Sequence, residues 1–211
     1  MNIKTRLFVL LIIFSFTTQI FSSSQSIKRD LDKNIDSLMQ KVVGWRHNIH
    51  EFPELSNREF QTAKKVADHL ESLGLEVKTG VAHTGVVAIL EGGKSGPMVA
   101  LRADMDALPV EEMTGLPFAS KVRDKYNGLD VGVMHACGHD AHVAILMGVA
   151  EFLVSVQDKL KGSVMFIFQP AEEGPPVGEE GGAELMLKEG IWKEKKPDAV
   201  FGLHVTNAPN G

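Results

Sequence analysis

A short stretch of the sequence concentrates side chains that bind metal ions. Residues 135–142 are His-Ala-Cys-Gly-His-Asp-Ala-His, and they include three of the eight histidines and the only cysteine. Thiolate, imidazole and carboxylate groups are common protein ligands of zinc and related metals. Cys137 and His139 are two positions apart, so in an extended backbone both side chains point the same way. The stretch therefore predicts one part of a metal site, which other segments have to complete.

Further side chains of the same kinds follow three predicted strands, in each case directly after the strand ends. They are Asp104, Asp106, Glu172, Glu173 and His204. Functional residues of α/β folds gather at the carboxyl edge of the strands. We therefore expect these five residues to lie at the same edge of a sheet and to face the cysteine and histidine of the first stretch.

Glu172 and Glu173 are adjacent, and this spacing suggests two separate roles. On a non-helical backbone neighbouring side chains face opposite sides, so one can bind metal while the other acts as a general base. A metal ion lowers the pKa of a bound water to near 7, and a nearby carboxylate can take its proton. The alternative is a solvated acidic loop, which we assign to Glu179 and Glu180 because they lie further from the buried strand.

For several residues a structural interpretation stays open beside the functional one. Cys137 alone would be an inert buried thiol, and His204 alone a core histidine with satisfied hydrogen bonds. Asp104 fits a strand-end turn or a helix cap equally well, whereas Asp106 could orient a ligating histidine. His47, His69 and His83 are interpreted as surface or structural residues. The roles of His135 and His142 stay undecided.

The apolar pattern predicts the elements that position these residues. Helices are expected at about residues 35–49, 60–73, 141–156 and 183–189, and strands at 75–78, 86–90, 98–101, 163–168 and 199–203. This order implies an α/β fold with three layers: a mostly parallel, mixed sheet with helices on both faces. Ser56 and Glu59 have the spacing of a capping box before the second helix. Residues 112–134 are polar and are expected to be irregular.

Composition and charge exclude some classes of protein. The chain has 211 residues and a formal charge of −5, with no block of basic residues. A nucleic-acid-binding protein is therefore not expected. A single cysteine cannot form an internal disulfide, so its thiol is inert, pairs between chains, or is a ligand.

The first 24 residues are typical of a secretory signal peptide. Lys4 and Arg6 precede an apolar run at residues 7–16, and small residues follow at 22–24. The alternative is a membrane anchor, but polar residues interrupt the run, which is shorter than the roughly 20 residues of a spanning helix. We expect residues 25–211 to be the mature domain, in the endoplasmic reticulum lumen or secreted, with no stable membrane span.

Five motifs in order resemble those of the metal-dependent amidohydrolases of the aminoacylase/carboxypeptidase family. They are Arg46-x-x-Ile49-His50-x-x-Pro53-Glu54-Leu55, Leu101–Pro109, Met134–His142, Gln169–Gly174 and Gly202–Val205. The family includes hippurate-hydrolase-like enzymes and the plant indole-3-acetic-acid–amino-acid hydrolases. With a secretory signal in front, the sequence looks closest to the plant enzymes.

The resemblance implies a zinc-peptidase-like catalytic domain with two divalent metal ions, Mn or Zn. The implied ligands are Cys137, His139, Glu173 and His204. Glu172 would be the catalytic base, and Asp106 would support the ligands from behind. The implied substrate is a small N-acyl amino acid, such as an auxin conjugate, which is cleaved at its amide bond into a free acid and an amino acid.

Family members continue past the motif around His204, with a smaller domain that forms a lid and a dimer contact and with a further histidine ligand. We therefore expect this chain to be the N-terminal part of the catalytic domain, with little activity alone, and to form a homodimer only if the missing domain is present. The alternative is a non-catalytic metal-binding short form that interacts with a full-length relative. Glu172 favours descent from an enzyme, because a binding module needs the ligands but no base.

Overall fold

The computed structural model describes the backbone of residues 3–206 and the side chains of residues 25–206. The chain divides into two compact units, Met1–Ser37 and Leu38–Gly211. Helix α1 (Ile3–Glu51) passes through the boundary between them, so the helix expected at 35–49 is the end of a longer one. Among the described residues, no helix has the length and apolar character needed to cross a membrane. The predicted signal peptide lies outside the described side chains, and residues 1 and 2 lie outside the described backbone, so it stays a prediction.

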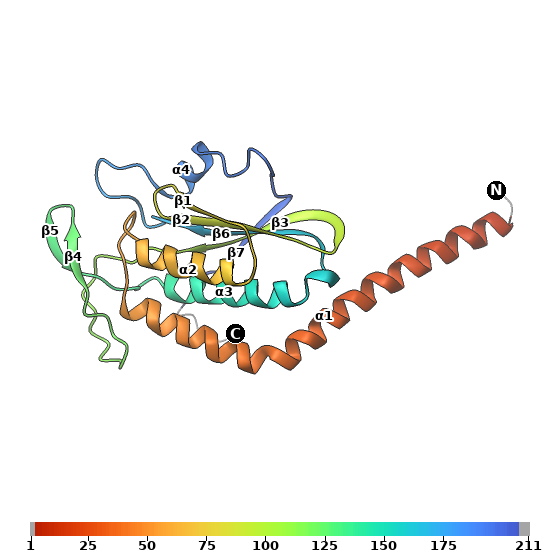
Figure 1. Ribbon diagram of the computed structural model, residues 1–211, viewed down its shortest axis with the longest axis horizontal. Helices are drawn as coiled ribbons and strands as arrows, with labels where there is room; N and C mark the ends of the chain where they lie inside the picture. Colours follow the sequence, from red (N-terminus) through yellow and green to blue (C-terminus); the bar gives the residue numbers. More distant parts are fainter. Residues whose placement is uncertain (1–2, 207–211) are drawn as a thin grey trace. The chain divides into compact units, whose positions relative to one another are not determined.

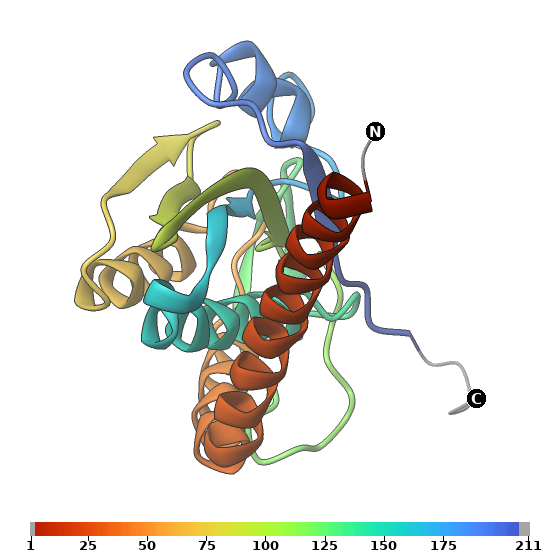
Figure 2. The ribbon, with the colours of Figure 1, turned by 90° about the vertical axis from the view of Figure 1, so that its right-hand side faces the viewer.

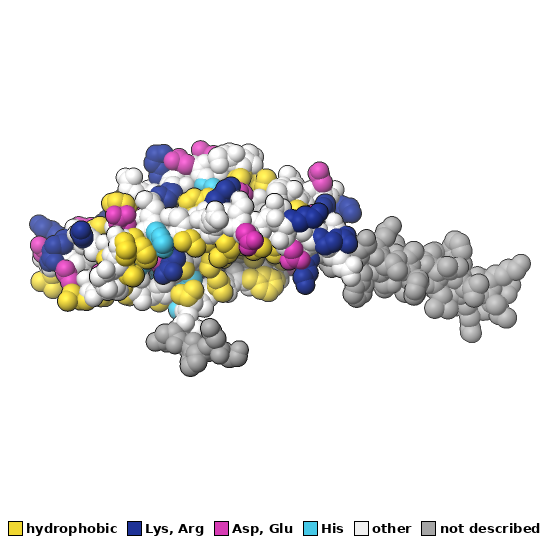
Figure 3. Space-filling model, turned by 90° about the horizontal axis from the view of Figure 1, so that it is seen from below, with side chains coloured by type: hydrophobic (Ala, Val, Ile, Leu, Met, Phe, Trp, Pro, Cys, Tyr) yellow, Lys and Arg dark blue, Asp and Glu magenta, His cyan; other side chains and the backbone are white. Residues whose placement is uncertain are grey.

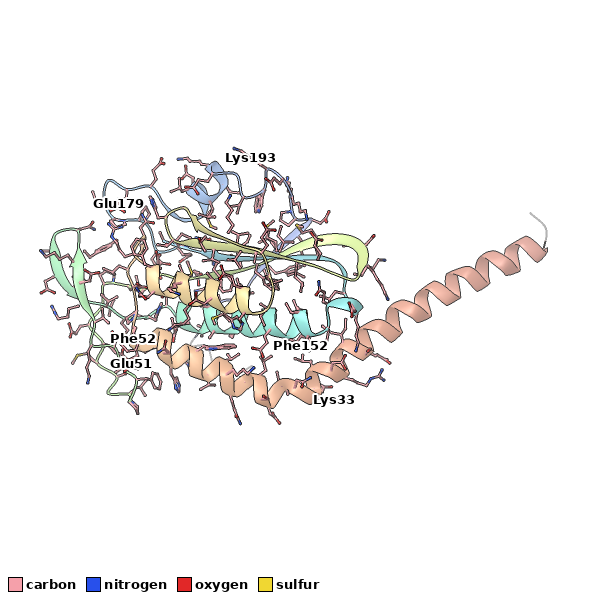
Figure 4. All side chains as sticks on the ribbon, viewed as in Figure 1. Lys33, Glu51, Phe52, Phe152, Glu179 and Lys193 are labelled. Carbon is pink, nitrogen blue, oxygen red and sulfur yellow. The ribbon has the colours of Figure 1, made fainter. Side chains whose placement is uncertain are left out.

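The part of α1 in the second unit is amphipathic. Val42 and Ile49 are buried, whereas the polar Lys41 and Asn48 are exposed, together with the apolar Met39 and Val43. Figure 3 shows hydrophobic side chains lying between charged ones on the surface that is seen from below. The helix ends at Glu51, labelled in Figure 4, two residues before Pro53.

A mixed sheet of five strands forms the centre of the second unit, in the order β1-β2-β6-β3-β7 (Figure 1). The strands are β1 (Val77–Val81), β2 (Gly85–Glu91), β3 (Lys94–Asp104), β6 (Lys161–Gln169) and β7 (Ala199–Gly202). Strands β3, β6 and β7 run parallel to one another, whereas β2 is antiparallel to β1 and β6. The predicted mixed sheet is confirmed, and each strand overlaps one that the sequence predicts.

Helices cover both faces of this sheet. Helices α2 (Phe60–Ser72) and α3 (His139–Ser155) lie on one face, and α4 (Gly182–Lys188) lies on the other (Figures 1 and 2). A short 3-10 helix, η1 (Gln157–Lys159), leads from α3 into β6. One hydrophobic core fills the space between the sheet and α2 and α3, and a smaller one lies under α4. The three predicted layers are therefore present.

Strand β6 is apolar over most of its length because both of its faces are buried. Phe166 and Phe168 belong to the larger core, whereas Met165 and Ile167 belong to the smaller one. A central strand between two helical layers has no solvent-exposed face, which explains a continuous apolar run instead of an alternating one. This packing fixes the position of the residues that follow β6.

The stretch expected to be irregular, residues 112–134, contains a hairpin of β4 (Arg123–Tyr126) and β5 (Leu129–Gly132). Its turn is formed by Asn127 and Gly128, with φ angles of 51° and 83°. A two-residue hairpin turn requires left-handed conformations at both positions, and Asn-Gly adopts them readily. The prediction for this stretch was therefore wrong at the hairpin, and the Asn-Gly pair is the signal that would have found it.

The predicted capping box at the start of α2 is also wrong. The carboxylate of Glu54, outside the helix, accepts hydrogen bonds from the backbone N–H and the hydroxyl of Thr62, at 2.8 and 2.9 Å. Ser56 instead donates its hydroxyl to the carboxylate of Asp106 at 2.7 Å. Glu59 is completely buried and does not cap the helix either. Both residues expected to cap α2 thus face the polar region beside the strand ends.

Candidate metal centre

Strands β3, β6 and β7 end at the same edge of the sheet because they run parallel. Asp104, the last residue of β3, pairs in register with Gln169, the last residue of β6. Strand β7 ends at Gly202, which pairs with Arg102. The residues that the sequence predicts for the site follow these strand ends or lie at the start of α3. They are Asp106, Cys137, His139, Glu172, Glu173 and His204.

The structure brings the four predicted ligands and the predicted base together. The possible ligand atoms of Cys137, His139 and Glu173 all lie within 4.8 Å of one another. Nε2 of His139 is 3.7 Å from a carboxylate oxygen of Glu172 and 3.8 Å from one of Glu173. Sγ of Cys137 is 3.5 Å from Nε2 of His204. One region is thus lined by sulfur, nitrogen and oxygen donors.

Cys137 and His139 flank the N-cap of α3 and do not lie in an extended segment. The N-cap is Gly138, with a φ of 94°, in the left-handed region that glycine adopts without steric cost. His139 is the first residue of the helix and is buried, whereas Cys137 is partly exposed. The two side chains converge as expected, but through a turn and not through a strand-like backbone.

Glu172 and Glu173 do not face opposite sides, because they lie in a turn that the carboxylate of Asp106 holds. Oδ1 of Asp106 accepts a hydrogen bond from the backbone N–H of Glu172, and Oδ2 accepts one from the backbone N–H of Glu173, each at 3.0 Å. Ala171 before them has a φ of 47°, which bends the chain away from the strand direction. Both glutamate side chains therefore approach the same nitrogen of His139, and the predicted alternation was wrong.

Asp106 also orients the imidazole of His139. Its backbone carbonyl lies 2.8 Å from Nδ1 of His139, so Nδ1 carries the hydrogen and donates it. Nε2, which faces Cys137 and Glu173, is then left with a free lone pair, the form in which histidine binds metal. Asp106 is almost completely buried. Although burial acts in the opposite direction, hydrogen bonds from His139, Ser56 and the turn lower the pKa of Asp106.

The acidic loop after this turn is separate from the site. Glu179, labelled in Figure 4, accepts hydrogen bonds from Arg58 at 3.0 Å and from Asn57 at 3.1 Å. The bond with Arg58 is the main reason why the pKa of Glu179 falls to about 2. Glu180 accepts a hydrogen bond from Lys188 at 2.9 Å. Glu179 and Glu180 thus pair with surface cations and do not face the metal-binding side chains.

The sequence model of peptidase family M20/M25/M40 matches residues 100–211. This range contains all the candidate site residues that follow β3, β6 and β7. The match covers more than half of the chain. The chain belongs to this peptidase family.

Several curated proteins are similar to this chain. Thermostable carboxypeptidase 1 of Saccharolobus solfataricus is 47% identical over 188 residues, which are 86% of this chain and 44% of that protein. IAA-amino acid hydrolase ILR1-like 5 of Arabidopsis thaliana is 40% identical over 203 residues, 93% of this chain and 43% of that protein. The M20 chain thus spans less than half the length of these relatives. Its likeness extends to microbial enzymes and is not specific to the plant hydrolases.

A solved structure supports the same assignment. The crystal structure of Bacillus subtilis YXEP, described as a dinuclear metal-binding peptidase of the M20 family, superposes with a TM-score of 0.69 at 41% sequence identity. The superposition covers 81% of this chain and 44% of YXEP. The fold of this M20 chain is therefore that of a metallopeptidase catalytic domain.

The electrostatics of the M20 site fit a divalent cation. Burial, a hydrogen bond with Glu173 and the charges of nearby carboxylates raise the pKa of the Cys137 thiol to about 11. Burial lowers the pKa of His139, but the neighbouring Asp106 and Asp104 raise it overall. Nε2 of His139 is buried and has no hydrogen-bond partner within the described residues. The carboxylates around Cys137 and Nε2 of His139 thus favour a positive charge between these two side chains. A divalent cation there would keep the cysteine as a thiolate.

For two further residues of the site the sequence left the role open: Asp104, with a structural alternative, and His142, which stayed undecided. Asp104 and His142 are both almost completely buried. Nδ1 of His142 lies 2.6 Å from Oδ1 of Asp104, and the two residues form, with His139, a second group of possible ligand atoms within 4.8 Å of one another. His139 and His142 are three positions apart on a helix and therefore share a face. That spacing is the signal that would have connected His142 with the site.

The first family motif builds a second buried network beside the site. Nδ1 of His50 lies 2.9 Å from the carboxylate of Asp140, which also accepts a hydrogen bond from Arg46 at 3.1 Å. Nε2 of His50 lies 3.2 Å from Glu112. His135, which is buried close to this network, is kept neutral because burial lowers its pKa to about 4. The network ties the end of α1 to the first turn of α3.

Glu59 connects α2 to the turn that contains the two site glutamates. Its carboxyl group accepts hydrogen bonds from the hydroxyl of Thr84 at 2.6 Å and from the backbone N–H of Ala171 at 2.8 Å. Burial raises the pKa of Glu59 from 4.5 to about 7. The folded protein therefore binds this proton more tightly than the unfolded chain does. Glu59 contributes stability that is fully present below pH 4.5 and is lost as the pH rises to about 7.

Replacing Glu59 by glutamine should remove this pH dependence. A glutamine can accept the hydrogen bond from Ala171 and donate one to Thr84, as the protonated acid does. We expect the variant to gain about 2–3 kcal/mol relative to the wild type between pH 5 and pH 8. Urea denaturation at several pH values measures this difference. Glu71→Gln, at an exposed position of α2, is the control, and equal pH slopes for Glu59→Gln and the wild type would contradict the assignment.

Proposed function

We propose that this chain provides the metal ligands and the general base of an amide hydrolase that acts on N-acyl amino acids. The observation that supports this most directly is the carboxylate of Glu172, which lies 3.7 Å from Nε2 of His139 but is not needed to complete the three-residue ligand group. A site that only bound metal would not require a second carboxylate at this point. The proposed metal content is two divalent ions, Mn or Zn, and the donor set suits both.

The proposed reaction divides the work between the metal and the side chains. A divalent cation held by Cys137, His139, Glu173 and His204 would polarise the amide carbonyl and lower the pKa of water. Glu172 accepts a proton from the attacking water and then donates it to the nitrogen of the leaving amino acid. Its side chain is partly exposed, at 38%, so substrate and water can reach it. The products are a carboxylic acid and a free amino acid.

Relatives support the substrate class. The plant relative at 40% identity is an IAA-amino acid hydrolase, and another relative, at 45% identity over 166 residues, is the hippurate hydrolase of Campylobacter jejuni. Both names describe amides between an aromatic acyl group and an amino acid. We propose auxin–amino acid conjugates as the preferred substrates. The predicted signal peptide would place the protein in the endoplasmic reticulum lumen or outside the cell, and N-terminal sequencing of the mature protein should then begin near residue 25.

Amine release from indole-3-acetyl-alanine, hippurate and an unacylated dipeptide tests the proposal. The assay is run, with Mn²⁺ or Zn²⁺ added, on the 211-residue chain and on the product of any longer reading frame of the same gene. We expect the longer product to hydrolyse the acylated substrates and the 211-residue chain to release little amine, and Glu172→Gln in the longer product should lower the rate about 10²–10⁴-fold. Glu184→Gln, on exposed α4, is the matched control. Metal-loaded proteins that release no amine from either acylated substrate would overturn the proposal.

The two adjacent glutamates should differ in metal binding. Glu173 belongs to the ligand group with Cys137 and His139, whereas Glu172 does not. We expect Glu173→Gln to weaken Zn²⁺ binding at least about tenfold, and Glu172→Gln to change it less than about threefold. Calorimetric titration with Zn²⁺ measures both affinities. Equal losses in the two variants would show that the assigned division of roles is incorrect.

A further inference from the structure

His142 uses both of its ring nitrogens within the protein. Nδ1 lies 2.6 Å from the carboxylate of Asp104, and Nε2 accepts a hydrogen bond from the backbone N–H of Val205 at 2.9 Å. These contacts fix the tautomer, with the hydrogen on Nδ1, because Nε2 must accept. The ring is only 2% exposed. Neither nitrogen is therefore available for a metal ion, although His142 lies one turn from the proposed ligand His139.

Asp104, the partner of His142, is itself held in place. Its second carboxylate oxygen accepts a hydrogen bond from Arg102 at 2.6 Å. Arg102 in turn donates to the side-chain oxygen of Gln169 at 2.9 Å. A chain of hydrogen bonds thus runs from the end of β6, across the end of β3, to His142 on α3 and on to Val205. The side chains of this network lie on β6, β3 and α3, so the position of the Val205 N–H is tied to three elements of the fold.

The side chain of Val205 has a second contact with α3. At Gly138 a Cβ atom would overlap Cγ2 of Val205, so the valine side chain occupies the space that the glycine leaves open. Strand β7 ends at Gly202, and the residues after it have no sheet partner among the described strands. Val205 is therefore fixed to the start of α3 by one hydrogen bond and one packing contact, and not by the sheet.

His204 depends on this attachment. It is exposed, and its Nε2 lies 3.5 Å from Sγ of Cys137. Nδ1 of its ring lies 2.6 Å from the carbonyl of Val205, and the ring makes an edge contact with the ring of His142. The histidine itself lies outside any helix or strand. Its position beside Cys137 follows from the position of Val205.

We propose that His142 is a positioning residue. It is held by Asp104 and binds the backbone N–H of Val205, whose side chain packs against Gly138. Holding Val205 in this way places His204 as a metal ligand. The inference rests on the proposed function, in which His204 binds metal. It assigns a role to a residue whose two ring nitrogens both form hydrogen bonds within the protein. The competing possibility is that His142 binds the metal directly together with Asp104 and His139, whose possible ligand atoms lie within 4.8 Å of its own.

The first part of the test needs no metal. In the metal-free protein the amide hydrogen of Val205 should exchange slowly, because His142 accepts it. We expect His142→Ala to accelerate this exchange about tenfold, as measured by NMR, which corresponds to the loss of one hydrogen bond. His142→Gln, whose side-chain oxygen can accept the same hydrogen, should restore most of the protection. Unchanged exchange at Val205 in the alanine variant would overturn the inference, whether or not the protein hydrolyses amides.

The second part separates a positioning role from a direct ligand. Zn²⁺ affinity and Co²⁺ absorption spectra are measured for the wild type, His142→Ala, His204→Ala and the double variant. We expect His142→Ala to bind Zn²⁺ about tenfold more weakly than the wild type. The double variant should bind Zn²⁺ almost as well as His204→Ala alone. The Co²⁺ spectra of the two single variants should change in the same way.

Controls make both outcomes decisive. The control is His69→Ala, which removes a half-buried histidine that is hydrogen-bonded to a backbone carbonyl of α3 away from the site. This variant should leave the Zn²⁺ affinity unchanged. Additive losses in the double variant, or a lower metal stoichiometry in His142→Ala, would show that His142 is itself a ligand and would reject the positioning role. If the wild-type protein bound no metal, the proposed function would be rejected instead. The hydrogen exchange of the Val205 amide would still test whether His142 holds Val205 in place.

Discussion

Replacing His139 by alanine is expected to reduce the affinity for Zn²⁺ more than about a hundredfold. A four-ligand zinc site contributes roughly 10–16 kcal/mol of binding free energy, so the loss of one ligand removes about 3 kcal/mol. His139 should have the largest effect because its imidazole is buried, preoriented by Asp106 and directed at the other donors. Competition with a chromophoric chelator measures the affinity.

A companion variant and a control sharpen this expectation. Cys137→Ser should also lower the metal content, because a hydroxyl is a poor substitute for a thiolate. His47→Ala should not, because His47 is stacked on Phe118 and is not among the possible ligand groups of the described residues. If His139→Ala bound Zn²⁺ with wild-type affinity and stoichiometry, the cluster at the start of α3 would not be the metal centre.

Replacing Asp106 by alanine is expected to destabilise the fold by about 3–5 kcal/mol and to disrupt the site at the same time. The buried carboxylate accepts hydrogen bonds from Ser56 and from the backbone N–H groups of Glu172 and Glu173. Its removal leaves these buried or partly buried donors without their partner, and each unsatisfied buried group costs roughly 1–3 kcal/mol. Urea denaturation measures the loss as a lower midpoint with an unchanged slope.

Asp106→Asn distinguishes charge from hydrogen bonding at this position. The amide can accept from only one of the two backbone N–H groups, because its own NH₂ faces the other, so we expect an intermediate loss of about 2–3 kcal/mol. The control is Asp68→Asn, an exposed residue paired with Lys64 on α2, which should change stability by less than about 0.5 kcal/mol. A stable Asp106→Ala variant with normal metal binding would mean that the turn holds Glu172 and Glu173 without this carboxylate.

Elements with long, clear apolar patterns were predicted well. Strand β6 extends only two residues before and one after the expected segment, and α3 starts two residues earlier than expected. In both cases burial on nearly all sides requires apolar residues at almost every position, so the sequence carries a strong signal. The metal-binding side chains could be predicted for a related reason. Parallel strands bring their carboxyl ends to one edge, whatever lies between them.

Features that depend on a distant partner could not be predicted. Ser56 and Glu59 have the spacing of a helix cap, but the carboxylate of Asp106, just after β3, and groups near β2 and β6 provide better hydrogen-bond partners. The turn that directs both Glu172 and Glu173 toward His139 exists because Asp106 binds their N–H groups. Nothing in the local sequence contains that information. The Asn-Gly hairpin turn is different, since its signal is local and was available.

The contacts that build this site also determine when it can form during folding. The three hydrogen bonds to the Asp106 carboxylate join residues 50, 66 and 67 positions apart, and Cys137 meets His204 across 67 positions. Contacts of such high order form late, after the local helices and hairpins. Cys137 should therefore remain accessible to thiol reagents until the last stage of refolding. Metal added before that stage should not accelerate folding, but metal added afterwards should slow unfolding, because it binds only the completed site.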